Sequence, residues 1–129
     1  MLRRIILELK KEGFICSLDD FGSGYSSLNV LKDLPIQVLK LDVLFFRGVS
    51  DIDKAWVIVE NIIHMAKQLN IRTVAEGVEE AEQIEHLRKC GCDIIQGYVF
   101  SRPLPADKFK ELVETDPRGN WGDGFKEKA

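Results

Sequence analysis

The sequence predicts an α/β fold built on a parallel β-sheet. Short apolar runs alternate along the chain with longer segments in which apolar residues recur every three or four positions. Strands that alternate with helices in this way form parallel sheets with right-handed crossovers. The apolar runs are nearly continuous, as expected for strands covered on both faces. We therefore expect a leading helix followed by four strand–helix units.

The first third of the chain is expected to hold two helices and two strands. Apolar residues at helical spacing begin at Leu2, and Gly13 is placed to end that helix. The run over residues 14–19 is apolar enough for a buried strand. A short helix over residues 26–34 stops before a proline, and a second strand follows over residues 36–42.

A long amphipathic helix is expected next. Ser50 is the predicted N-cap, with Asp53 three residues further on as the partner in a capping box. The apolar positions repeat at helical spacing, so one face should pack on the sheet. That face comprises Ile52, Ala55, Trp56, Val59, Ile62, Ile63, Ala66 and Leu69.

The rest of the chain continues the alternation of strands and helices and ends in a polar tail. Gly91 is placed to end one helix, and Phe109 lies on the apolar face of the last one. We expect one domain over residues 1–115 and a flexible tail, rich in glycine and charge, over residues 116–129. The remaining elements are expected to be a strand over residues 71–76, a helix over 79–90, a strand over 92–97 and a helix over 106–114.

Composition excludes several classes of protein. The net charge of −3 argues against binding to a nucleic-acid polymer, which usually needs a basic face. Three cysteines, at 16, 90 and 92, fit neither a disulfide framework nor a usual zinc knuckle and predict reduced thiols. The sequence contains neither an apolar run long enough for a membrane span nor a convincing secretion signal, so we expect a cytoplasmic location.

Polar residues stand where the predicted strands end. In parallel α/β proteins, ligands bind outside the carboxyl ends of the strands, and residues two apart on a strand share a face. A single residue of this kind is often a cap, a turn former or a solvated charge. Their convergence on one rim of the sheet predicts a functional site. The converging residues are Asp19, Asp20, Lys40, Asp42, Glu76 and Gln96.

The adjacent pair Asp19 and Asp20 needs a positive partner, because like charges at close range disfavour each other's ionisation. Divalent Mg²⁺ or Mn²⁺ would supply it, since hard cations prefer oxygen ligands. Successive strand residues point to opposite faces, so the chain must bend here to bring both carboxylates to one side. Gly22 and Gly24 are the expected source of that bend.

Other polar and aromatic residues have simpler interpretations. His64 and His86 lie on predicted helices away from the rim and are expected to be at the surface or partly packed. Trp56 is expected to pack against the core. The triplet Asp-Phe-Gly at residues 20–22 also occurs in protein kinases, but no other kinase motif accompanies it.

Four motifs together resemble a known family. "LDDFGSGYSSL", "LKLD", "TVAEGVE" and "QGYVFSRPLP" are similar, in order and spacing, to the second half of the EAL domain. The resemblance covers residues 14–113 and implies the last four β/α units of a TIM-like (β/α)₈ barrel. It also implies hydrolysis of cyclic di-GMP to linear pGpG by a mechanism that uses two metal ions.

The resemblance assigns roles residue by residue. Asp19 and Asp20 match metal-binding aspartates, Lys40 matches the catalytic lysine, and Glu76 matches a glutamate that holds the metal–water cluster. The positions expected to contribute to substrate binding are Asp42, Glu79, Gln96 and Pro103. The loop expected to couple the metal site to the family's dimer interface comprises Phe21, Gly22, Ser23, Gly24, Tyr25, Ser26 and Ser27.

Two departures from the family pattern leave alternatives open. Val43 and Leu44 stand where the family usually has a basic and then a small polar residue. The Glu-Ala-Leu motif is absent, so the metal site is expected to be incomplete and the chain inactive by itself. The chain is then a fragment, the partner of a first half or of a second copy, or a non-catalytic nucleotide-binding or dimerisation module. An unrelated small phosphatase is a further alternative.

Overall fold

A computed structural model of the chain describes residues 1–21, 28–43 and 50–116. Four parallel strands form one sheet in sequence order, which confirms the predicted α/β class. Residues 22–27 of the predicted loop 21–27 and residues 117–129 of the predicted tail 116–129 lie outside the described residues. The strands are β1 (Ser17–Phe21), β2 (Val38–Asp42), β3 (Arg72–Glu76) and β4 (Ile94–Ile95).

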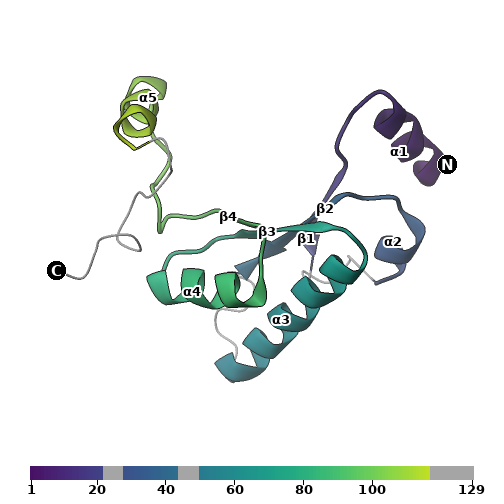
Figure 1. Cartoon of the computed structure of the whole chain (residues 1–129), viewed down its shortest axis with the longest axis horizontal. Coiled ribbons are helices and arrows are strands. Elements are labelled where there is room, and N and C mark those ends of the chain that lie inside the picture. Colours follow the sequence, from purple (N-terminus) through teal and green to yellow (C-terminus); the bar gives the residue numbers. More distant parts are fainter. Residues whose placement is uncertain (22–27, 44–49, 117–129) are drawn as a thin grey trace.

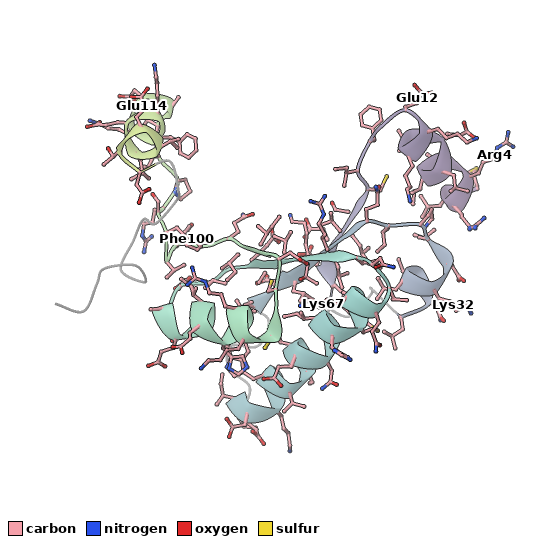
Figure 2. The ribbon with its side chains drawn as sticks, in the orientation of Figure 1. Arg4, Glu12, Lys32, Lys67, Phe100 and Glu114 are labelled. Atoms are coloured by element: carbon pink, nitrogen blue, oxygen red, sulfur yellow. The ribbon has the colours of Figure 1, made fainter. Side chains whose placement is uncertain are left out.

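The described helices lie mainly on one side of the sheet. Figure 1 shows α3 and α4 against one face, with α1 and α5 standing away from the sheet at opposite ends. Figure 2 shows side chains filling the space between the sheet and α3 and α4. The helices are α1 (Leu2–Lys11), α2 (Leu28–Asp33), α3 (Ile52–Gln68), α4 (Ala81–Cys90) and α5 (Ala106–Thr115).

The core lies between the sheet and helices α3 and α4. Leu39 and Leu41 of β2 are fully buried, as are Ile63 of α3 and Leu87 of α4. The intervening residues of β2 are only partly buried, because they point to the other face of the sheet. The expectation that both faces are covered holds for the middle of β3, where residues 73–75 are all buried, but not for β2, whose second face is partly exposed. This partly exposed face carries the polar residues of the predicted rim.

Strand β1 begins later than predicted. Phe14 and Ile15 are each 60% exposed, and the Phe14 N–H donates to the Leu9 carbonyl at the end of α1. The first pairing with the next strand occurs at Cys16, whose carbonyl accepts from Gln37 N–H at 2.9 Å. The strand predicted from apolar composition alone therefore begins too early, in the turn that follows α1.

Helix α3 is capped by Asp51 rather than by the predicted Ser50. The Asp51 carboxylate accepts a hydrogen bond of 3.1 Å from the Lys54 N–H, as an N-cap residue does. Ile52 and Leu69, at the two ends of the helix, are more than half exposed and do not belong to its buried face. The predicted core positions that are buried are Ala55, Val59, Ile63 and Ala66.

Strand β4 is fixed beside β3 by a polar contact between their starts. The Asp93 carboxylate accepts hydrogen bonds from the Thr73 N–H at 2.8 Å and from the Thr73 hydroxyl at 3.1 Å. Thr73 is fully buried, so this carboxylate satisfies groups that would otherwise be desolvated without a partner. The contact sets the position of the segment that leads to Gln96.

Helices α1 and α5 bury none of their residues fully. Phe109 is 54% exposed, so the predicted last helix forms but does not pack its aromatic residue on the described core. Among the described residues, no helix combines the length and apolar character needed to cross a membrane.

Candidate functional site

A β-bulge in β1 leaves both adjacent aspartates exposed. Leu18 is opposite Leu39 in the register, but Phe21 is opposite Leu41, so β1 contains one extra residue. Phe21 is buried in the core, whereas Asp19 and Asp20 are both exposed. In a regular strand, Asp20 would share the core-facing side of Leu18. The bulge removes that conflict, and such bulges are common beside functional sites.

The bend arises at Asp20 itself. Its φ is 55°, in the left-handed region that aspartate tolerates better than most residues, and its N–H donates to the Asp19 carboxylate at 2.8 Å. The predicted bend between the aspartates is therefore present. Gly22 and Gly24, the expected source of the bend, lie outside the described residues.

Lys40 contacts two other predicted site residues, Asp19 and Glu76. Its Nζ lies 2.6 Å from the Glu76 carboxylate and 3.4 Å from the Asp19 carboxylate. The Lys40 and Glu76 side chains are 27% and 20% exposed, so this pair is partly shielded from water. Three strands thus place one ammonium between two carboxylates at their carboxyl ends. Of the residues predicted to converge, this arrangement brings Asp19, Lys40 and Glu76 together.

The environment of Lys40 keeps its ammonium charged. The hydrogen bond to Glu76 is the main cause that raises the pKa of Lys40 above its ordinary value of 10.5. The negative charges of Glu76 and Asp19 act in the same direction, and partial burial acts against them. Lys40 is therefore a hydrogen-bond donor and a positive charge at neutral pH, and it cannot accept a proton in that state.

This shift predicts a pH dependence of stability. The pKa of Lys40 is higher in the folded chain than in the unfolded chain, where it is 10.5. The charged lysine therefore stabilises the fold fully at pH values below 10.5, and this contribution is lost as the pH rises above that value. We expect the difference in urea midpoint between the wild-type chain and Lys40→Met to be constant at neutral and mildly alkaline pH and to shrink above 10.5. Lys32→Met, at an exposed lysine, is the matched control; an equal change in that variant would contradict the assignment.

Asp42 and Glu79 lie near this group in the fold. Asp42 is the register partner of Glu76 across β2 and β3, so the two carboxylates stand on neighbouring strands at the same rim. Glu79 is exposed in the connection between β3 and α4, and its N–H donates to the Gln83 side chain at 3.0 Å. Asp42 is thus the last residue of β2, as predicted, whereas Glu79 precedes the helix in which it was expected.

Gln96 and Pro103 line a groove between β4 and α5. Its volume is about 480 Å³, and its walls are largely aromatic and aliphatic, including Phe100 and Leu104. The Arg102 guanidinium lies 4.8 Å from the centre of the Tyr98 ring, beside the same groove. Tyr98 and Arg102 were not singled out from the sequence, because only the folded connection after β4 places them together.

The donor set of the rim fits hard divalent cations. Asp19, Asp20 and Glu76 offer carboxylate oxygens, the ligand type that Mg²⁺ and Mn²⁺ prefer. Both aspartates are exposed at the bulge and therefore accessible to a ligand. The described part of the rim thus offers oxygen ligands of the type that hard divalent cations prefer, with Lys40 between Asp19 and Glu76.

Comparison with known proteins identifies the relatives of this chain. The sequence model of the EAL domain matches residues 1–103. The cyclic di-GMP phosphodiesterase NbdA of Pseudomonas aeruginosa is 41% identical over 109 residues, which are 84% of this chain and 14% of that protein.

Solved structures of EAL domains share the fold. The EAL domain protein of Listeria monocytogenes is 39% identical with a TM-score of 0.78, and the match covers 88% of this chain and 46% of that one. BlrP1 of Klebsiella pneumoniae, in a complex with manganese and cyclic di-GMP, is 33% identical with a TM-score of 0.69. That match covers 79% of this chain and 26% of BlrP1. The chain thus spans less than half of each of these proteins.

Proposed function

Because the chain belongs to the EAL domain family, we propose that it forms the C-terminal half of a phosphodiesterase that hydrolyses cyclic di-GMP to linear pGpG. The observation that carries the proposal is the placement of Lys40 between Asp19 and Glu76 at the carboxyl ends of three parallel strands. Relatives named as cyclic di-GMP phosphodiesterases, at about 40% identity over most of the chain, support the choice of substrate.

Asp19, Asp20 and Glu76 would hold the metal ions of this reaction. Two Mg²⁺ or Mn²⁺ ions, when bound, lower the pKa of a water molecule and stabilise negative charge on the phosphate oxygens. The manganese-containing complex of BlrP1 supports this type of ion. The bulged backbone at Asp20 would keep both aspartate side chains on the side where the substrate enters.

Lys40 would act as a fixed cation rather than as a base. Its ammonium, held by Glu76, can donate a hydrogen bond to the attacking water or to a phosphate oxygen. A positive donor placed where charge develops stabilises the transition state more than the ground state. The hydrogen bond to Glu76 orients this donor before the substrate binds.

The groove beside β4 would receive part of the nucleotide. Gln96 offers an amide that can both donate to and accept from a base edge, while the aromatic and aliphatic walls suit a flat ring. Pro103 stiffens the segment that forms one side of the groove. Asp42 and Glu79 would complete the contacts at the rim, between the groove and Lys40.

The partly exposed face of the sheet favours a second candidate function. Strands β1 and β4 form the edges of the described sheet, and open edges of this kind favour association with further strands. The chain could then pair with a first half-barrel or with a second copy, through the loop of residues 21–27 among other contacts. In that case it would be a binding or dimerisation module without hydrolytic activity.

The test is an assay of cyclic di-GMP hydrolysis with Mn²⁺, with pGpG measured by chromatography. The chain is assayed alone and together with the part of a relative EAL domain that it does not match. We expect hydrolysis in the mixture and its loss with Asp20→Asn, whereas Asp107→Asn on α5 should retain it. Calorimetric binding of cyclic di-GMP with no pGpG formed in the mixture would overturn the proposal and favour the second candidate.

A further inference from the structure

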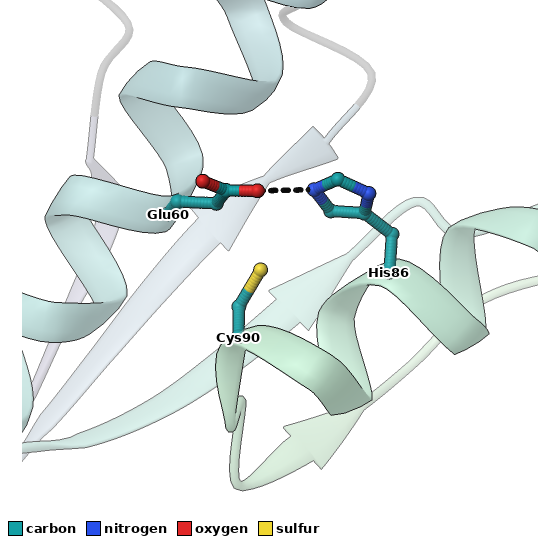
Figure 3. Close-up of side chains that lie close together, drawn as sticks. All are labelled: Glu60, His86 and Cys90. Atoms are coloured by element: carbon teal, nitrogen blue, oxygen red, sulfur yellow. Dashed lines mark hydrogen bonds and ion pairs between the residues drawn. The ribbon is translucent and has the colours of Figure 1, made fainter.

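A second cluster of metal-ligating side chains lies on α3 and α4, away from the rim. Glu60 on α3 faces His86 and Cys90 on α4, as Figure 3 shows. The Glu60 carboxylate lies 2.7 Å from His86 Nε2, and one ligand atom from each of the three residues lies within 4.8 Å of the others. These residues have no part in the proposed phosphodiester chemistry.

The sequence spacing supports a site that joins the two helices. Glu60 and His64 are four residues apart on α3, and His86 and Cys90 are four residues apart on α4. Residues at this spacing share one face of a helix. All four line the same cavity, of about 470 Å³, which therefore collects both histidines of the chain.

We propose that Glu60, His86 and Cys90 bind a zinc ion, with His64 as the fourth ligand. One thiolate, two imidazoles and a carboxylate are a donor set typical of Zn²⁺ and unlike the all-oxygen set of the rim. Zinc–ligand bonds of about 2.0–2.3 Å place ligand atoms of a tetrahedral site about 3.3–3.8 Å apart. The three observed atoms therefore need to move by only about an ångström, which side-chain rotation provides.

The charges at the cluster are balanced by such an ion. Burial, followed by the nearby Glu60 carboxylate, raises the pKa of the Cys90 thiol. A divalent ion would offset one thiolate and one carboxylate, with neutral histidines as the other ligands. Lys89 also lines the cavity, but its ammonium is paired with Glu85 at 2.9 Å.

The position of Cys90 differs from that of the nearby Cys92. The Cys92 thiol donates to the Ile94 carbonyl at 3.2 Å and is not among the residues that line the cavity. The two cysteines are two residues apart, and all three cysteines of the chain are free of disulfides. Cys92 is thus a matched control for any effect of removing a thiol near the end of α4.

The experiment is titration of the full chain with Co²⁺, a spectroscopically visible substitute for zinc, followed by competition with Zn²⁺. We expect a thiolate-to-cobalt charge-transfer band in the near ultraviolet and visible bands of tetrahedral intensity. Cys90→Ser should abolish the charge-transfer band, and His64→Gln and His86→Gln should each weaken affinity at least about tenfold. Cys92→Ser and the rim double variant Asp19→Asn/Asp20→Asn should retain the band.

Several outcomes would overturn the proposal. A band that survives Cys90→Ser, or that is lost in Cys92→Ser, would place the thiolate elsewhere. Octahedral, weak visible bands that disappear in the rim double variant would show that cobalt binds only at the carboxylates. Circular dichroism of each variant without metal checks that Cys90→Ser, a nearly isosteric change, leaves the fold intact.

Discussion

Replacing Lys40 with methionine is expected to lower the rate of cyclic di-GMP hydrolysis by about a hundred- to a thousandfold. The substitution removes the ammonium that contacts both Glu76 and Asp19 but keeps a side chain of similar length. Removal of one preorganised donor from an active site has effects of this size. The measurement is kcat in the Mn²⁺-dependent assay, with the complementary half-domain present.

Two further variants make the result specific to Lys40. Lys32→Met, at a lysine whose side chain is 77% exposed on α2, should leave kcat unchanged. Lys40→Arg should restore little activity, because a planar guanidinium cannot reproduce the position of a compact ammonium. Unchanged kcat in Lys40→Met would remove Lys40 from the reaction and leave it as a structural ion pair between β2 and its neighbours.

The alternation of strands and helices was predictable because apolar residues repeat every three or four positions in a helix and form short runs in a buried strand. Local patterns identified α3, α4 and the order of the strands, and two of the residues at the strand ends, Asp19 and Glu76, contact Lys40. Exposure was less predictable, since an apolar run does not show whether another element covers it. Phe14 and Ile15 illustrate this, because they were assigned to a buried strand and lie exposed before it.

At the candidate site too, some features were predictable from the local sequence, and others depend on contacts between distant segments. A bend between Asp19 and Asp20 followed from the alternation of side chains along a strand, but its position at the backbone of Asp20 did not. The cluster of Glu60, His86 and Cys90 joins residues 26 and 30 positions apart, so no local motif indicated it.

Gly97→Ala is expected to destabilise the fold by about 2–4 kcal/mol, because no room exists for a side chain there. A Cβ at Gly97 would lie 2.5 Å from the Val78 nitrogen and 2.7 Å from its carbonyl carbon, and closer still to the carbonyl oxygen. These are backbone atoms, so a side-chain rotation cannot relieve the overlap.

The overlap would act on the hydrogen bonds that hold β4 and the groove in place. Val78 N–H donates to the Gln96 carbonyl at 3.2 Å, and the Val78 carbonyl accepts from Val99 N–H at 3.1 Å. Moving Gly97 away from Val78 strains both bonds and shifts the walls of the groove that Gln96 and Gly97 line. We therefore expect weaker binding of cyclic di-GMP in addition to the loss of stability.

Gln96→Ala separates these two effects. It removes the amide side chain but keeps the backbone bonds of Gln96, including the 2.8 Å bond from its N–H to the Ala75 carbonyl. Its side chain is exposed, so the free energy of unfolding should change by less than about 0.5 kcal/mol while nucleotide affinity falls. Urea denaturation of both variants measures the difference. Equal stability of Gly97→Ala and the wild-type chain would show that the contact between Gly97 and Val78 does not constrain the segment after β4.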